Sequence, residues 1–367
     1  MTHPLSPPDD TGDDERRQGD RHCDERESTH VTTGTNQLGA AAPHAIVIMN
    51  ARSGEHGDED ARGVIEAALR NAGWRPEVLT APEPAALEGL AQRARDARPA
   101  LVVVAGGDGT VNVVANAVAD TGISFAVIPM GTFNYFARLH AIPDDIASAS
   151  RLSPGDMPKT VGVGEVNGRV FLNNLSIGLY TSIIEARERD KKIWGRHRLV
   201  ALVSALWVAL KPAGRRRVTL QTPTGETRMR VAMIFVGANA LQLEDANLPL
   251  ANEFALGKLG VVMLKAAGPW KLFKAVLGMV MGTAHELEDV TIEAHAELRI
   301  AMRRSDTRVV IDGEIVRLRT PLAVRFRPGV LRLLRPSPAA DGTREAQGTT
   351  SAELASPANP AVAPKSV

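Results

Sequence analysis

The sequence predicts an α/β fold: an N-terminal parallel α/β domain followed by a C-terminal antiparallel, β-rich domain of the sandwich type with added helices. Between residues 45 and 150, short apolar strands alternate with helical stretches, whereas from residue 159 onward strand patterns and hairpin turns dominate. The content of 44% hydrophobic and 23% charged residues is typical of an ordinary folded protein.

Strand and helix patterns alternate through the first half. Strands are expected at 45–49, 77–80, 101–105 and 125–129, and helices at 60–73, 85–97 and 111–120. This alternation indicates a parallel sheet, whose ligand sites lie beyond the carboxyl ends of the strands. The predicted domain therefore spans residues 42–157.

The second half, residues 158–336, carries strand patterns at 159–177, 215–238, 290–302, 308–318 and 322–334. VNGRV and TPTGET are typical of hairpin turns. Long helical patterns at 181–211 and 269–282 interrupt these strands, and the polar tails 1–41 and 337–367 are expected to be disordered.

Composition excludes several classes of protein. A net charge of +1 gives no overall field for nucleic acid, and the single cysteine, Cys23, rules out an internal disulfide framework. The longest apolar run, 199–210, is shorter than a membrane span, and the acidic N-terminus is unlike a signal peptide. We expect a cytoplasmic protein, and its oligomeric state stays open.

The stretch LVVVAGGDGTVNVVANAV, residues 101–118, joins a buried strand to a helix through a glycine-rich turn. Such a turn exposes backbone N–H groups that attract anions, and Thr110 is expected to cap the helix. Asp108 would repel a phosphate unless a cation such as Mg²⁺ lay between them. The turn thus predicts a nucleotide with its metal, although a simple tight turn is the alternative.

Two further turns follow predicted strands. NARSG places Asn50, Ser53 and Gly54 after the first strand, and MGTFN places Gly131, Thr132 and Asn134 after the fourth. Since carboxyl ends of parallel strands share one edge, we expect the three turns to lie along it.

Together, NARSG, GGDGT and IPMGTFNYFAR, with the later FLNNLSIGLY and VVIDGEIV, resemble the diacylglycerol kinase catalytic-domain family, which includes bacterial lipid kinases and, more distantly, sphingosine kinases. The resemblance runs from about residue 44 to 336. It implies an ATP-dependent lipid kinase that uses Mg²⁺ and phosphorylates a lipid alcohol, diacylglycerol or a related lipid, between two domains. A NAD kinase-like activity and an inactive nucleotide- or lipid-binding protein are the alternatives.

The resemblance also implies roles for single residues. Asp312 would be the general base, with Glu314 nearby, and Asp108 would hold Mg²⁺ directly or through water. The nucleotide would contact residues from the turns: Asn50, Arg52, Ser53, Gly54, Thr80, Gly106, Gly107, Asp108, Gly109, Thr110, Asn112, Thr132 and Asn134. Where the family has an acidic loop holding a structural Mg²⁺, this chain has Ala255, Leu256 and Gly260 with only Glu253 nearby, so we assign no such site.

The lipid-facing side is predicted from a basic and apolar stretch, residues 186–217. Basic residues beside apolar surface suit peripheral attachment to the inner face of an anionic membrane. A helix packed on the second domain is the alternative. The residues concerned are Lys191, Lys192, Trp194, Arg196, Arg198, Trp207 and Arg215–Arg217, with Met279 and Met281 as candidate acyl contacts.

Overall fold

The computed structural model describes residues 41–51, 58–179, 181, 216–241, 256–265, 268, 271, 274 and 288–337. The predicted tails and nearly all of the long helical patterns at 181–211 and 269–282 lie outside these residues. From Ala42 onward the chain forms one compact unit.

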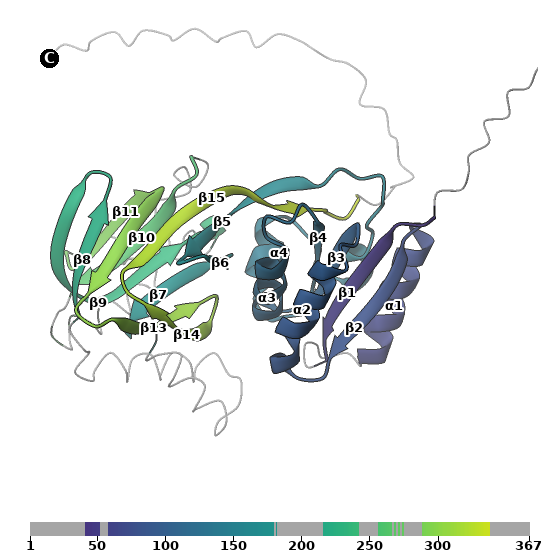
Figure 1. Ribbon diagram of the computed structural model, residues 1–367, viewed down its shortest axis with the longest axis horizontal. Coiled ribbons are helices and arrows are strands. Elements are labelled where there is room, and N and C mark those ends of the chain that lie inside the picture. The colour runs from purple at the N-terminus through teal and green to yellow at the C-terminus, as the bar shows by residue number, and fades with distance from the viewer. Residues whose placement is uncertain are drawn as a thin grey trace, which may run out of the picture. The chain divides into compact units, whose positions relative to one another are not determined.

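The first half is a parallel sheet with helices, as predicted. Its strands are β1 (His44–Asn50), β2 (Arg75–Ala81), β3 (Leu101–Gly106) and β4 (Ser124–Pro129), in the spatial order β4-β3-β1-β2. The helices are α1 (Asp58–Asn71), α2 (Leu87–Asp96), α3 (Asp108–Val118), α4 (Tyr135–Leu139) and α5 (Ile146–Ala149), with a 3₁₀ turn at Pro84–Ala86 (Figure 1).

The second half consists of antiparallel strands, which confirms the predicted fold class. They are β5 (Lys159–Val166), β6 (Arg169–Phe171), β7 (Asn174–Gly178), β8 (Arg216–Thr222), β9 (Gly225–Gly237), β10 (Leu259–Lys265), β11 (Val290–His295), β12 (Glu297–Met302), β13 (Asp306–Ile311), β14 (Glu314–Arg319) and β15 (Leu322–Leu333). The end of β15 returns to the parallel sheet, where Arg332 and Leu333 pair with Ser124 and Phe125 of β4. The predicted boundary at 157/158 falls just before β5.

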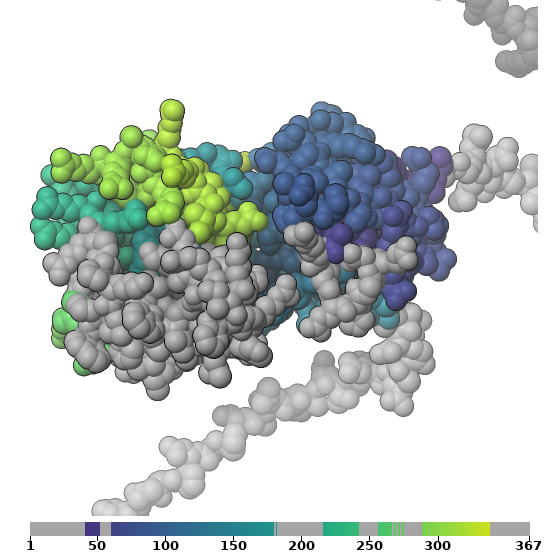
Figure 2. All heavy atoms as spheres, turned by 90° about the horizontal axis from the view of Figure 1, so that it is seen from below, coloured from purple at the N-terminus to yellow at the C-terminus, as the bar shows by residue number. Residues whose placement is uncertain are grey.

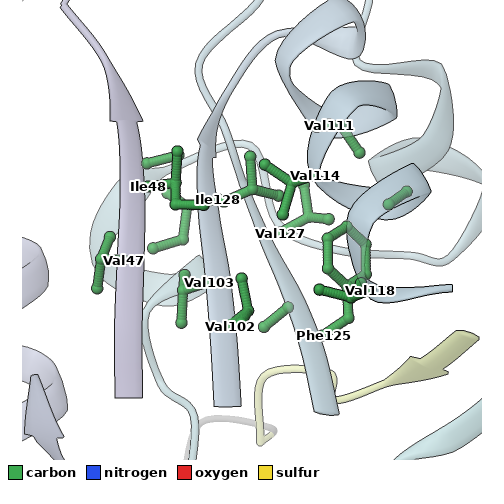
Figure 3. Packing of buried hydrophobic residues seen from close by; sticks show 14 of the residues in the cluster. Val47, Ile48, Val102, Val103, Val111, Val114, Val118, Phe125, Val127 and Ile128 are labelled. Atoms are coloured by element: carbon green, nitrogen blue, oxygen red, sulfur yellow. The ribbon is translucent and has the colours of Figure 1, made fainter. Parts of the chain in front are cut away.

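Each half has its own hydrophobic core. In the first, Val103, Phe125 and Ile128 are fully buried against Val114 and Val118 of α3 (Figure 3). In the second, Leu175, Ile234, Val261 and other strand residues form a separate cluster. No helix among the described residues has the length and hydropathy that a membrane crossing requires.

Two hairpin turns of the second half reach positive φ. Asn167 and Gly168, between β5 and β6, have φ of 48° and 83°, and Asp312 and Gly313, between β13 and β14, have φ of 46° and 90°. Two successive positive φ angles define a type I′ turn, which matches the twist of the flanking strands. The prediction of a hairpin at VNGRV is therefore confirmed, and DGE also forms a turn.

Candidate functional site

The glycine-rich turn leads directly from β3 into α3. The helix begins at Asp108, and Gly107 occupies the N-cap position with an extended backbone. Thr110 lies inside the first turn and is buried, so the prediction that it caps the helix is wrong. The hydrophobic spacing starts at Val111, but the acidic Asp108 suits the positive end of the helix dipole and extends the helix backward.

The carboxyl end of β1 and the turns after β3 and β4 meet at one edge of the sheet, and the NARSG turn beyond Ala51 lies outside the described residues. The Asn50 side-chain amide donates a hydrogen bond of 3.3 Å to the Thr110 hydroxyl. The backbone N–H of Met130 donates to the carbonyl of Gly106 at 3.0 Å. Gly107 and Gly131 approach so closely that a β-carbon on Gly131 would lie 2.6 Å from the Gly107 Cα.

Asn134 fixes the loop after β4. It adopts a left-handed backbone, with φ of 48°, immediately before α4. Its side-chain oxygen accepts from the Gly131 N–H at 2.9 Å, while its amide donates to the Gly131 carbonyl at 3.0 Å. This pair of bonds closes the loop and holds Gly131 against the turn before α3.

Asp312 is buried, and both of its carboxylate oxygens are fully engaged. Oδ1 accepts from the backbone N–H groups of Asn173 and Asn174, each at 2.8 Å. Oδ2 accepts from the Leu172 N–H and the Asn112 side-chain amide, each at 2.7 Å. Burial raises the pKa of Asp312 to about 6, although the backbone hydrogen bonds lower it. The carboxylate thus ties the β13–β14 turn to α3 and to the segment between β6 and β7.

Asp108 lies close to this cluster through Asn173. The Asn173 amide donates to Asp108 Oδ1 at 3.3 Å, and Asn239 in turn donates to the Asn173 side-chain oxygen at 2.9 Å. Asn239 is completely buried after β9 and also donates to the Tyr135 carbonyl. Burial raises the pKa of Asp108, and its charge helps to raise the pKa of Asp312.

A cavity of about 850 Å³ opens beside the first turn of α3. From the first half, the cavity is lined by Asn50, α2 residues and Gly107, Asp108, Gly109 and Thr110. From the second half, it is lined by Asn167, Gly168, Arg169 and Glu314. In the space-filling view, the yellow-green surface of the last strands meets the blue surface of the first half (Figure 2). The described lining residues therefore come from both halves of the chain.

Glu314 and Arg169 line the same cavity as the glycine turn. Glu314 Oε1 lies 3.2 Å from the position that a β-carbon on Gly109 would occupy. Burial raises the pKa of Glu314, while the Arg169 charge lowers it. The Arg169 Nε is buried and has no hydrogen-bond partner among the described residues. An unpaired guanidinium N–H beside a helix N-terminus favours an anionic ligand.

The other predicted site residues either lie outside the described residues or do not line this cavity. Arg52, Ser53 and Gly54 fall outside the described residues. Thr80 and Thr132 are exposed and do not line the cavity. Asn112 does not line it either, because its amide donates to Asp312 and to the Val170 carbonyl. The loop expected to lack a structural metal site is described only from Leu256 onward.

Sequence reasoning missed four polar residues: Asn116, Arg169, Asn173 and Asn239. Asn116 lines the cavity and makes two hydrogen bonds with the backbone of Val170, donating at 3.0 Å and accepting at 2.8 Å. Asn173 lies in FLNNLSIGLY, one of the motifs that carry the family resemblance, so this motif could have indicated it. Asn239 offered none, because its partners lie 66 and 104 residues away in the chain.

The donor set suits a metal bound together with phosphates. No group of three or more His, Cys, Asp or Glu residues that could hold a metal ion occurs in the described part of the chain. Mg²⁺ is often held by one or two carboxylates plus substrate phosphates and water, and Asp108 beside the glycine turn fits that pattern.

The first half of the chain is similar to a known protein family. Residues 44–166 match the family described as "Diacylglycerol kinase catalytic domain". This part of the chain, about one-third of its length, is therefore similar to that family. The matched segment contains the glycine turn, Asn134 and Arg138, and ends at Val166, where β5 also ends.

Curated relatives match the same region. A Pseudomonas syringae protein named "Probable lipid kinase YegS-like" is 33% identical over 141 residues, which is 38% of this chain and 46% of the relative. A Bacillus subtilis protein named "Diacylglycerol kinase" is 40% identical over 86 residues, 23% of this chain and 28% of the relative. The matches thus span less than half of either relative.

Structural similarity extends further along the chain. The crystal structure of a diacylglycerol kinase from Bacillus anthracis superposes with a TM-score of 0.61 at 23% identity, covering 80% of this chain and 97% of that chain. This similarity shows that both halves share its fold.

Proposed function

We propose that the protein is an ATP-dependent lipid kinase, which transfers the γ-phosphoryl group of ATP to the hydroxyl of a lipid alcohol such as diacylglycerol. One observation carries the proposal: the N-terminal turn of α3 shares a cavity with Arg169 and Glu314 of the second half. The family match of residues 44–166 and the names of the curated relatives support the same function.

The cavity suits phosphoryl transfer because that reaction needs mainly positioning and charge neutralisation. Backbone N–H groups of Gly107–Thr110 would bind the phosphates at the positive end of α3. Asp108 would hold Mg²⁺, which supplies positive charge to the phosphates when bound. Arg169, whose Nε lacks a partner among the described residues, would donate to the same phosphates.

Two carboxylates are candidates for the base that accepts the hydroxyl proton. Asp312 has a pKa raised to about 6, so it is ionised at neutral pH and is still basic enough to accept a proton. Its two oxygens already accept four hydrogen bonds, so one donor must move away first. Among these four donors from the described residues, only the Asn112 amide is a side chain. Glu314 lines the cavity directly and is the alternative base.

A labelled-phosphate assay tests the proposed function. Purified full-length protein is incubated with ATP labelled at the γ-phosphate, Mg²⁺ and a panel of acceptors: diacylglycerol, monoacylglycerol, sphingosine and NAD. We expect labelled lipid and a loss of at least about 10²-fold in Asp108→Asn, since a misplaced phosphate costs about that much. Asp96→Asn is the matched control, because Asp96 is an exposed surface carboxylate at the end of α2.

Three results would overturn the proposal. Labelled NAD with unlabelled lipids would indicate a NAD kinase-like enzyme. ATP binding with no labelled product from any acceptor would indicate a binding protein that lacks catalysis. Equal activity in Asp108→Asn and Asp96→Asn would remove the glycine turn from the reaction.

A further inference from the structure

Strands β8, β9 and β12 carry an unusually basic outer face. Val218, Leu220 and Ile300, on the inner face, are at most 3% exposed and belong to the second core. Because side chains alternate along a strand, the neighbouring positions point the other way. These outward positions hold the exposed Arg217, Arg228, Arg230, Arg299 and Arg303, which we call the arginine face.

The register of the strands brings like charges together. Arg217 of β8 lies directly opposite Arg230 of β9, and Arg303 follows Met302, the partner of Val218. Like charges in directly opposed positions destabilise a sheet, so this arrangement is costly for the isolated fold. An anionic ligand placed over the face would reverse that cost.

Little negative charge compensates the arginines. Glu226 shares the face and pairs with Arg228 at 3.0 Å, and Glu297 lies at its far end, opposite Arg325 of β15. Between the arginines, over the smaller Thr219 and Ala301, the surface is hollowed by about 560 Å³. The face therefore presents an excess of guanidinium groups around a shallow depression.

The spread of the arginines favours an extended anionic surface over a single small anion. Neighbouring strands are about 4.8 Å apart and alternate residues about 6.8 Å apart, so the array covers about 10 by 14 Å. That area exceeds a single phosphate and suits several anionic groups presented on one plane. Among the described residues, the paired positions of β8, β9 and β12 place no aromatic side chain on this face to stack with bases, as single-stranded nucleic acid would require.

We propose that the arginine face docks the protein on the surface of a membrane that contains anionic phospholipid. This inference rests on the proposed function, because a lipid kinase must reach a substrate held in a bilayer. It assigns a membrane contact to described strands, and one of its residues, Arg217, is the last residue of the basic and apolar stretch 186–217. Binding itself requires no catalysis, so it is measured independently.

Vesicle flotation with the full-length chain tests the docking. The probes are vesicles of pure phosphatidylcholine and vesicles in which about one-third of the lipid is phosphatidylglycerol, at about 0.1 M salt. Each basic residue at an anionic surface contributes about fivefold in affinity, so Arg217→Gln with Arg230→Gln is expected to weaken binding about 25-fold. Arg62→Gln with Arg75→Gln removes the same charge from exposed positions of the first half and is the control.

The outcomes separate the docking from the proposed function. Selective binding to phosphatidylglycerol vesicles that the Arg217/Arg230 variant loses, with unchanged activity on detergent-dispersed diacylglycerol, supports the docking. Equal losses in both double variants, equal binding to both vesicle types, or tighter binding to a DNA duplex would overturn it. Wild-type protein that binds vesicles but phosphorylates no lipid would contradict the proposed function and leave the docking intact.

Discussion

Replacing Gly131 by alanine tests whether the contact between the two glycine loops positions the phosphate site. The new β-carbon would lie 2.6 Å from the Gly107 Cα and 2.8 Å from Asn134 Oδ1. Carbon atoms in favourable contact are about 3.5–4.0 Å apart, so the loops must separate by about 1 Å. The φ of Gly131 lies outside the left-handed range, and therefore the steric contact alone carries the effect.

The size of the effect follows from that displacement. A shift of about 1 Å in a positioning group can cost about 10²-fold in rate. Overpacking costs about 1–3 kcal/mol of stability, which a folded variant can tolerate. We therefore expect Gly131→Ala to fold but to lose about 10²-fold in kcat/KM for ATP, with weaker binding of a non-hydrolysable ATP analogue.

The assay pairs kinase kinetics and analogue binding with urea denaturation. The control is Gly63→Ala on α1, where a new β-carbon meets nothing within 4 Å. Alanine in a helix is more stable than glycine by about 0.5–1 kcal/mol, so this variant should gain stability and keep its activity. A folded Gly131→Ala protein with normal kcat/KM and normal analogue binding would refute the reasoning.

Three further predictions follow from the charged groups. Asp312→Asn should destabilise the fold by about 1–3 kcal/mol, because both carboxylate oxygens accept only from N–H donors and the new NH₂ group would leave some of those donors unpaired. An unchanged urea denaturation midpoint would contradict this prediction. Folding raises the pKa of Asp312 from 3.8 to about 6, so the folded state binds this proton more tightly, and the stability that Asp312 contributes should fall as the pH rises from about 4 to about 6. If Asp312 is the base, kinase activity should rise over the same pH range. A flat pH–rate profile would argue against Asp312 as the base. Arg169→Gln should raise KM for ATP and lower kcat, while Arg75→Gln should leave both unchanged; equal kinetics in the two variants would exclude Arg169 from the phosphate site.

The local elements of the first half could be predicted from sequence because their signals are local. Apolar runs such as 101–105 specify buried strands, and glycines with Asp108 specify the turn that follows. The start of α3 was misplaced because its hydrophobic spacing begins at Val111, whereas the first turn consists of the polar or small Asp108, Gly109 and Thr110. Hydrophobic periodicity does not report such a turn.

The polar contacts between the two halves could not be predicted in the same way. The hydrogen bond from Asn112 to Asp312 joins residues 200 positions apart, and Asn239 reaches Asn173 across 66. A buried asparagine within an apolar run has no sequence signature, because its partners are fixed only when the sheets pack. The resemblance supplied Asp312 and Glu314, but it did not reveal that Asp312 is enclosed by donors while Glu314 faces the cavity.

The structure of a complex with a non-hydrolysable ATP analogue and Mg²⁺ is the most direct measurement of where the triphosphate binds. The analogue's phosphates should lie against the backbone N–H groups that open α3, with the Arg169 guanidinium in contact and Glu314 across from them. Phosphates bound elsewhere, with Arg169 and Glu314 both remote from the nucleotide, would contradict the assignment of this cavity.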